Sequence, residues 1–237
     1  MSTTTAATRS KPTVSVADWL SRHWYKIFLI VYGLWVGIPF LAPLFMYIGW
    51  DGVGKAIYFI YSFFCHQLPQ RSYFLFGQKP TYSLTEVQAA WQNTLNPLIL
   101  RKFIGNETMG WKIAWSDRMA ALYTSVWLFA LIWFPLRRKV KPLSWWGFIL
   151  LFLPMILDGG THAFSDFAGI GQGFRDTNIW LVALTNNSLP ATFSAGDALG
   201  SFNSWMRLLS GFLAGFGIVW LVFPNFFSDA SPQSGIG

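Results

Sequence analysis

Residues 27–48 read IFLIVYGLWVGIPFLAPLFMYI and contain no charged side chain. As an α-helix this stretch extends about 33 Å, which matches the roughly 30 Å hydrocarbon core of a bilayer. The stretch is longer than the apolar core of a signal peptide, and no clear cleavage site of small residues follows it. It therefore predicts a retained membrane-spanning helix.

Three further apolar stretches have a similar length, at residues 119–135, 143–164 and 206–224. A fifth, Lys55 to Phe64, would cross only about half of the hydrocarbon core as a helix, so we expect it to be interfacial or re-entrant. The composition agrees, with 53% hydrophobic and 11% charged residues. The predicted fold is an all-α, polytopic membrane helix bundle with about four transmembrane helices plus one short interfacial or re-entrant helix.

Basic residues next to the predicted spans indicate the orientation, because basic loops are retained in the cytoplasm. Such residues precede the first span and separate the second from the third: Arg9, Lys11, Arg22, Lys26, Arg137, Arg138, Lys139 and Lys141. Residues 158–204 contain one base, Arg175, and four aspartates, so we expect them outside. We predict a multi-pass protein of the plasma (cytoplasmic) membrane of a bacterium, with both termini cytoplasmic.

The same pattern predicts the domain organisation. Residues 1–18 form a disordered cytoplasmic tail, 19–227 a single membrane domain with outer-face loops 65–117 and 165–204, and 228–237 a flexible C-terminal tail. Within the first loop, residues 81–112 show intermittent helical periodicity, and Ser83 or Thr85 can cap the start. We therefore expect this loop to fold against the outer membrane face.

The net charge of +7 does not indicate a nucleic-acid partner, because the basic residues are dispersed at span ends and form no basic helix. Anionic lipid headgroups of the bilayer are the simpler partner. Two Gly-x-x-x-Gly pairs, Gly33 with Gly37 and Gly211 with Gly215, allow close helix packing. The helix packed there is either internal to the chain or belongs to a membrane-protein partner or a second copy.

Polar residues cluster in three places at the predicted outer edge of the bundle. Residues 65–73, CHQLPQRSY, combine a thiol, an imidazole, an amide and a guanidinium after the short apolar helix. They either bind a metal or an anion, or form a polar turn that ends the short helix, with Pro69 as the helix breaker. Asp117 and Arg118 are either a satisfied interfacial pair or part of a site. If the third span stays helical, Asp158, His162 and Asp166 share one face and can bind a divalent metal, relay protons or form a structural His–Asp pair; if the glycine pair after Asp158 breaks the helix, the three groups separate.

These residues also carry a family resemblance. The chain resembles a family of small multi-spanning membrane proteins known as domain of unknown function 2085. The matching segments are residues 65–73 with Gly77, Arg118 with Tyr123, residues 157–161, residues 201–203 and residues 207–211. Where the family has a Cys-x-Arg-Cys motif, this chain has Ser116-Asp117-Arg118-Met119, so the soft-metal site that the family pattern implies is incomplete. His162 replaces the usual glutamine and Asp117 is an added carboxylate, so a change from thiolate to imidazole and carboxylate ligands is chemically compatible with this sequence.

Two functions remain open. In the first, a polar site at the outer end of the bundle binds a divalent metal such as zinc through His66, Asp158, His162 and Asp166, and hydrolyses a lipid-like substrate. The side chains that would contact the substrate or support the site are Cys65, Gln67, Arg71, Asp117, Arg118, Asn203 and Arg207. In the second, the protein is a non-catalytic accessory or assembly subunit of a larger membrane complex. No serine-hydrolase motif is present in the sequence.

Overall fold

The computed structural model describes residues 15–227. The predicted C-terminal tail and the first fourteen residues of the predicted N-terminal tail lie outside this range. Within it, helix α1 begins at Val16, because the Ser15 hydroxyl accepts a hydrogen bond from the Asp18 backbone N–H at 3.1 Å and caps the helix. The last residues of the predicted tail are therefore helical.

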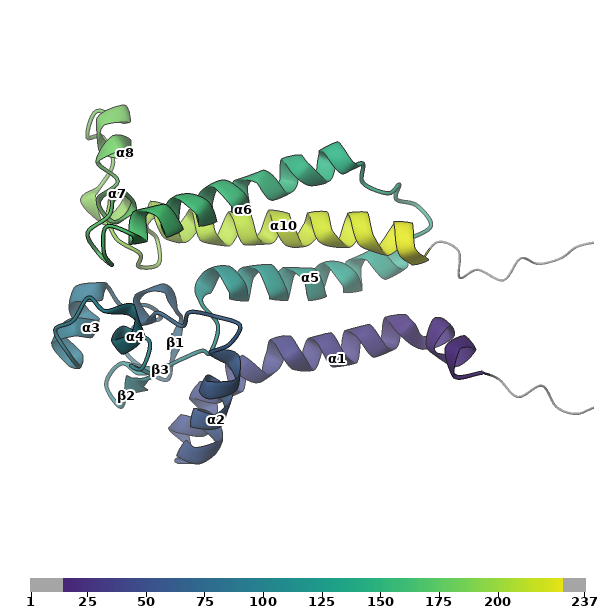
Figure 1. Ribbon diagram of the computed structural model, residues 1–237, viewed down its shortest axis with the longest axis horizontal. Coiled ribbons are helices and arrows are strands. Elements are labelled where there is room, and N and C mark those ends of the chain that lie inside the picture. The colour runs from purple at the N-terminus through teal and green to yellow at the C-terminus, as the bar shows by residue number, and fades with distance from the viewer. Residues whose placement is uncertain (1–14, 228–237) are drawn as a thin grey trace, which may run out of the picture.

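Within residues 15–227, four helices are long and apolar enough to cross a membrane, which confirms the predicted number. They are α1 (Val16–Tyr47), α5 (Asp117–Leu136), α6 (Trp145–Asp166) and α10 (Phe202–Phe227). In Figure 1, the start of α1, the connection between α5 and α6 and the end of α10 lie at one end of the bundle. The long loops lie together at the other end, as the predicted topology requires, and this end is called the loop end below.

Helix α10 lies between α5 and α6, and α1 packs on α5 from the other side (Figure 1). Gly211 and Gly215 face α5: a Cβ atom on Gly215 would lie 2.0 Å from the Ser125 Oγ and 3.0 Å from the Val126 backbone nitrogen. The glycine pair of α10 thus makes an internal helix contact. In α1, Gly33 makes room for the Trp127 indole, while Gly37 has open space around its Cβ position.

Two prolines inside α1 remove backbone N–H groups and leave two carbonyls without a partner in the helix. The N–H of residue 39 would bond to the Trp35 carbonyl, and that of residue 43 to the Pro39 carbonyl. Both carbonyls have other donors: the Tyr61 hydroxyl bonds to Trp35 O at 2.8 Å, and the Ala114 N–H bonds to Pro39 O at 3.1 Å. These bonds fix the loop end of α1 to two later segments.

Tyr61 ends the short helix α2 (Asp51–Tyr61), which corresponds to the predicted short helix and packs against the second half of α1. Its 11 residues extend about 16 Å, roughly half of the hydrocarbon core. Gly54 allows this contact, because a Cβ there would lie 2.6 Å from the Met46 sulfur.

Residues 65–117 form a compact subdomain at the loop end. It contains the 3₁₀ helix η1 (Pro69–Arg71), α3 (Leu84–Ala90), α4 (Pro97–Leu100) and an antiparallel sheet in the order β1 (Phe74–Leu75), β3 (Gly110–Lys112), β2 (Gly105–Asn106). Ser83 and Glu86 form a capping box at the start of α3, which confirms the predicted cap. The hydrophobic core of this subdomain includes Leu68, Phe74, Val87, Leu100 and Phe103.

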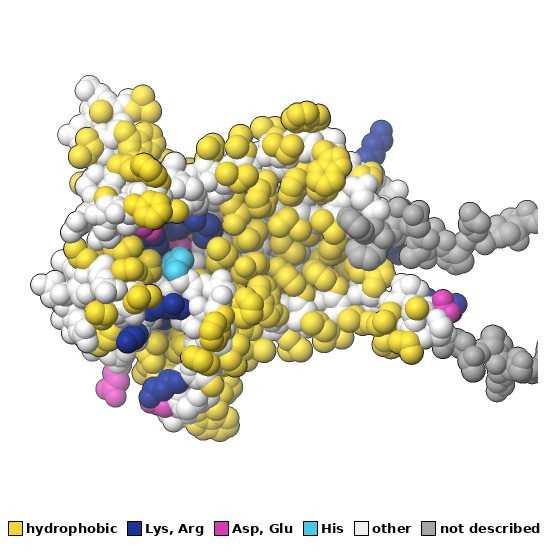
Figure 2. Space-filling view, in the orientation of Figure 1, with side chains coloured by type: hydrophobic (Ala, Val, Ile, Leu, Met, Phe, Trp, Pro, Cys, Tyr) yellow, Lys and Arg dark blue, Asp and Glu magenta, His cyan; other side chains and the backbone are white. Residues whose placement is uncertain are grey.

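The second loop, residues 167–201, contains three short helices: α7 (Phe174–Thr177), α8 (Ile179–Leu184) and α9 (Ala191–Ser194). Figure 1 shows α7 and α8 beyond the end of α6, next to the start of α10. In Figure 2, apolar side chains cover the long helices and charged side chains gather at the loop end. This distribution fits a bundle embedded in a bilayer with a polar cap.

Candidate functional site

Charged side chains are buried at the loop end, where α5 begins, α6 ends and α10 begins. Four arginines and four aspartates take part: Arg71, Arg118, Arg175, Arg207, Asp117, Asp158, Asp166 and Asp197. Three of the long helices contribute charged residues: Asp117 and Arg118 come from α5, Asp158 and Asp166 from α6, and Arg207 from α10. The loops supply the rest through η1, α7 and the segment before α10.

Arg71 and Arg207 form an inner set with three carboxylates. The Arg207 Nε donates to Asp117 Oδ2 at 2.7 Å, and its Nη1 to Asp197 Oδ1 at 2.6 Å. The Arg71 Nε donates to Asp197 Oδ2 at 2.8 Å, and its Nη1 and Nη2 bind both Asp166 oxygens at 2.7 and 2.8 Å. Two cations face three anions, so this set carries one net negative charge.

Asp197 is the carboxylate that links the inner set. Burial by itself raises the pKa of Asp197, but the guanidinium charges of Arg71 and Arg207 outweigh burial and hold this pKa well below its usual range. Asp197 is thus ionised at any physiological pH. The Nε, Nη1 and Nη2 atoms of both arginines donate hydrogen bonds, and these bonds connect η1, α5 and α10.

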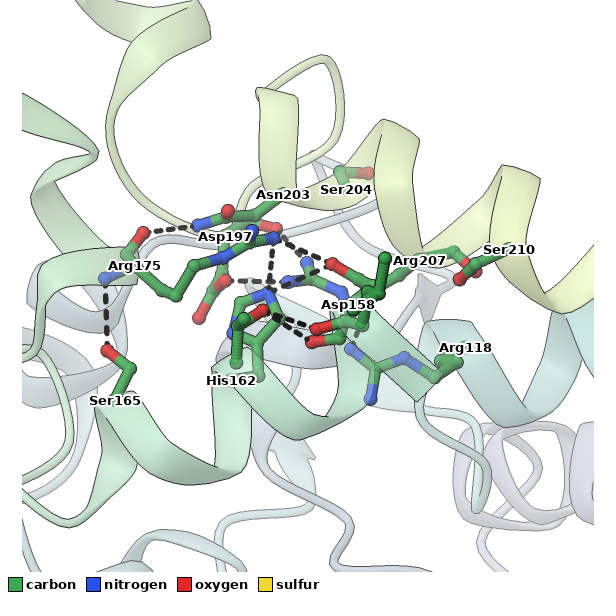
Figure 3. A network of polar contacts seen from close by, with 12 residues as sticks. Arg118, Asp158, His162, Ser165, Arg175, Asp197, Asn203, Ser204, Arg207 and Ser210 are labelled. Carbon is green, nitrogen blue, oxygen red and sulfur yellow. Dashed lines mark hydrogen bonds and ion pairs between the residues drawn. The ribbon is translucent and has the colours of Figure 1, made fainter. Parts of the chain in front are cut away.

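Arg118 and Arg175 form an outer pair that shares one carboxylate, Asp158 (Figure 3). The Arg175 Nη2 donates to Asp158 Oδ1 at 2.6 Å, and the Arg118 Nη2 donates to Asp158 Oδ2 at 2.8 Å. Among the described residues, neither arginine Nε has a hydrogen-bond partner, although both are buried. Burial lowers the pKa of Arg175, and the Asp158 charge opposes this only in part. The outer pair therefore has one net positive charge and two unused N–H donors.

His162 lies beside the outer pair and has a side chain only 4% exposed. Its Nε2 is 3.2 Å from the Arg175 Nη2. A guanidinium can only donate, so Nε2 accepts and the imidazole is neutral, with its proton on Nδ1. That Nδ1 has no hydrogen-bond partner among residues 15–227. It is therefore a third buried N–H donor without an acceptor, in addition to the Nε atoms of Arg118 and Arg175.

Neutral polar side chains hold Arg175 in place. The Asn203 Nδ2 donates to the Arg175 carbonyl at 2.6 Å and to the Gly196 carbonyl at 3.0 Å. The Arg175 backbone N–H donates to the Ser165 Oγ at 3.0 Å. The chain then turns at Asn178, which has a φ of +45° and is fully buried. Asparagine tolerates this left-handed conformation better than most residues.

Cys65, His66 and Gln67 lie in the segment between α2 and η1 and make hydrogen bonds of their own. The Cys65 Sγ accepts from the Ser116 N–H at 3.2 Å, and the His66 Nδ1 accepts from the Leu68 N–H at 3.0 Å. The Gln67 amide donates to the Tyr58 carbonyl at 2.9 Å. These bonds support the interpretation of this motif as a polar turn, since the Cys65 Sγ, the His66 Nδ1 and the Gln67 amide nitrogen each have a structural partner.

The structure does not support the predicted metal site of His66, Asp158, His162 and Asp166. Helix α6 continues through Gly159 and Gly160, so Asp158, His162 and Asp166 share a face as expected. However, guanidinium groups pair with both of these carboxylates, and the His66 Nδ1 accepts a hydrogen bond from the Leu68 backbone N–H. Within residues 15–227, no three His, Cys, Asp or Glu side chains are arranged to bind a metal ion.

Two members of the network, Arg175 and Asp197, were not predicted as site residues. Arg175 was recognised as the lone base in an otherwise acidic loop, and this isolation was the available signal. Asp197 carried no signal in the sequence, because both of its partners lie in other elements.

A lateral pocket opens beside the outer pair, between α6, α10 and the α7–α8 segment. It has a volume of about 1050 Å³. Its polar side chains are Asp158, Thr161, Gln172, Arg175 and Thr177. Apolar side chains line most of the rest: Pro154, Leu157, Phe174, Ile179, Trp180, Phe202 and Met206. The pocket therefore combines a charged floor with walls that continue the membrane-facing surface of α6.

Comparison with known proteins agrees with the sequence pattern. Residues 107–221 match a family described as predicted membrane protein (DUF2085). The uncharacterized protein MJ1492 of Methanocaldococcus jannaschii is 27% identical over 214 residues, which cover 87% of this chain and 94% of that protein. No solved structure matches the chain. The resemblance to this membrane family thus extends over α5, α6 and α10, and so over the helices that build the ion network.

Proposed function

From this resemblance to a membrane family and the geometry of the site, we propose that the protein binds an anionic, lipid-like amphiphile in the lateral pocket. The outer pair carries the proposal: Arg118 and Arg175 share the single carboxylate of Asp158, next to an apolar cavity of about 1050 Å³. This volume is at the upper end of the range of ligand pockets in proteins. The headgroup binds at the charged floor and the acyl part lies against the apolar walls.

The charge at the floor favours an anion over a neutral headgroup. Two guanidiniums share one carboxylate in the outer pair, so its excess of positive charge is local: the inner set carries the opposite excess, and the eight side chains together are neutral. A phosphate or carboxylate beside the outer pair provides acceptors for the free Arg175 Nε and a negative charge next to the guanidinium that lines the pocket. Every guanidinium nitrogen of Arg71 and Arg207 already donates a hydrogen bond, so we assign anion binding to Arg175, with Arg118 as its neighbour on Asp158.

The apolar walls favour an amphiphile over a soluble anion. Leu157, Pro154 and Met206 lie on the two long helices at the pocket, while Ile179 and Trp180 close it from α8. Leu157 is 57% exposed and Ile179 is 69% exposed on the described chain. In a bilayer these surfaces contact acyl chains, so a lipid reaches the charged floor sideways, without leaving the membrane.

The geometry supports binding more directly than hydrolysis. The carboxylates that a metal-dependent mechanism requires are paired with guanidiniums, and the neutral His162 accepts a bond from Arg175. The carboxylates and His162 therefore contribute to the charge and shape of a binding site.

The test uses Trp180 as a reporter, because its ring lines the pocket. The protein is placed in nanodiscs with brominated phosphatidylglycerol or brominated phosphatidylcholine, and the Trp180 signal is the difference between wild type and Trp180→Phe. We expect the anionic lipid to quench this signal at lower mole fraction. Arg175→Gln should weaken the preference about tenfold or more, because a hydrogen bond to a charged group contributes about 1.5–3 kcal/mol.

Lys102→Gln is the matched control, because it removes one positive charge from an exposed side chain at the same end of the protein. Leu157→Trp gives a second test that leaves the ion network intact and fills the pocket. It should reduce the number of phosphatidylglycerol molecules retained in native mass spectrometry. Equal quenching by both lipids, or a preference that Arg175→Gln and Lys102→Gln change equally, would refute the proposal.

A further inference from the structure

A second cavity lies at the loop end, on the other side of α7 from the lateral pocket. It has a volume of about 340 Å³, and its walls share no residue with those of the lateral pocket. Gln70 of η1, the start of α3 and the residues around Asp176 and Asp197 form these walls. Within α7, Arg175 lines the lateral pocket and Asp176 lines this cavity. It is called the polar cavity below.

Gln70 has an unusual position in this cavity. Its residue is only 2% exposed, yet neither its Oε1 nor its Nε2 has a hydrogen-bond partner among the described residues. A buried amide is usually satisfied, because an unmade hydrogen bond is unfavourable. Since Gln70 lines the polar cavity, a molecule there that carries both a donor and an acceptor would satisfy both ends of the amide.

The charge of the walls selects among such molecules. No lysine or arginine lines the polar cavity, whereas Asp176 and Asp197 both do. The Asp197 charge is compensated by Arg71 and Arg207. The Asp176 carboxylate accepts a hydrogen bond from the Gly173 N–H at 2.9 Å, and it forms no salt bridge within residues 15–227. One carboxylate is therefore left for a cation.

We infer that the polar cavity binds a small organic cation that carries an ammonium group and a hydroxyl group. The ammonium pairs with Asp176, and the hydroxyl both donates to and accepts from the Gln70 amide. Ser83, Thr85 and Thr192 supply further hydroxyl groups along the wall. A volume of about 340 Å³ is at the lower end of the range of ligand pockets and accommodates a small ammonium alcohol together with water. This site is independent of the proposed lipid site.

The experiment is isothermal titration of the purified full-length protein with ethanolamine. Ethylene glycol, which replaces the ammonium by a hydroxyl, tests the role of charge. We expect one ethanolamine per chain and binding at least about tenfold tighter than that of ethylene glycol, because a hydrogen bond between charged groups is strong. Asp176→Asn should remove this difference, since asparagine keeps the acceptor for the Gly173 N–H but has no charge.

Gln70→Leu should weaken both ligands about tenfold, because each uses the amide. Asp51→Asn is the control, since it removes an exposed carboxylate of α2 that pairs with Lys55 away from the cavity. If Gln70→Leu does not fold, Asp176→Asn decides, because it alters no ion pair of the network. Absent ethanolamine binding, equal affinity for ethylene glycol, or unchanged binding by Asp176→Asn would each overturn the inference and indicate a water-filled cavity.

Discussion

Replacing Tyr61 by phenylalanine tests how the proline-containing helix α1 is held. The substitution keeps the ring in its buried position, 4% exposed, and removes only the hydroxyl that donates to the Trp35 carbonyl at 2.8 Å. Because residue 39 is a proline, this carbonyl has no backbone donor in its own helix. A buried acceptor that loses its partner costs about 1–3 kcal/mol. We expect Tyr61→Phe to lower the free energy of unfolding by that amount.

The strongest form of this test restores the missing donor. Pro39→Ala supplies a backbone N–H that can bond to the Trp35 carbonyl in the normal helical pattern. In that background Tyr61→Phe should cost less than about 0.5 kcal/mol, which gives a coupling energy of about 1–2 kcal/mol between the two sites. Pro39→Ala is expected to have its own effect on α1, and the cycle separates that effect from the coupling.

The assay is equilibrium unfolding of the four proteins in mixed micelles with increasing sodium dodecyl sulfate, followed by circular dichroism. Tyr47→Phe is the control, because the Tyr47 side chain is 58% exposed. It should change the free energy of unfolding by less than about 0.5 kcal/mol. The reasoning is refuted if Tyr61→Phe behaves like this control, or if its effect is the same with proline and with alanine at position 39.

Two further predictions concern packing and pH. Gly215→Ala should destabilise the protein by about 1–3 kcal/mol, because the new Cβ would lie 2.0 Å from the Ser125 Oγ and 3.0 Å from a backbone nitrogen of α5. Gly37→Ala is the control: nothing lies within 4 Å of its Cβ position, so it should be neutral or stabilising by up to about 1 kcal/mol. Equal thermal unfolding of the two variants would contradict this packing. Burial lowers the pKa of Lys112 from 10.5 to about 7, with a further lowering by Arg101 that Cys65 opposes. Between these two pKa values the unfolded state binds more protons at Lys112 than the folded state. The free energy of unfolding should therefore rise from about pH 7 to pH 10, by up to about 1.4 kcal/mol per pH unit relative to Lys112→Met. Parallel profiles of stability against pH for the two proteins would argue against this prediction.

The sequence alone determined the membrane class of this protein and its helices. A span is set by the length of an apolar stretch, and this quantity is local. The capping box of α3 was also predictable, because Ser83 and Glu86 are three residues apart. The common face of Asp158, His162 and Asp166 followed in the same way from the helical repeat. In each case the interacting groups are close along the chain.

Tertiary structure decided which partner each polar group has. Arg71 pairs with carboxylates 95 and 126 positions away, and Arg207 with one that is 90 positions away. An isolated carboxylate on a helix face is equally compatible with a metal ion and with a guanidinium, and the choice depends on which loop reaches it. For Asp158 that loop brings Arg175, so a guanidinium pairs with the carboxylate that one interpretation of the sequence assigned to a metal ion. The glycine pairs show the same limit, because equal spacing places Gly215 against α5 and leaves Gly37 open.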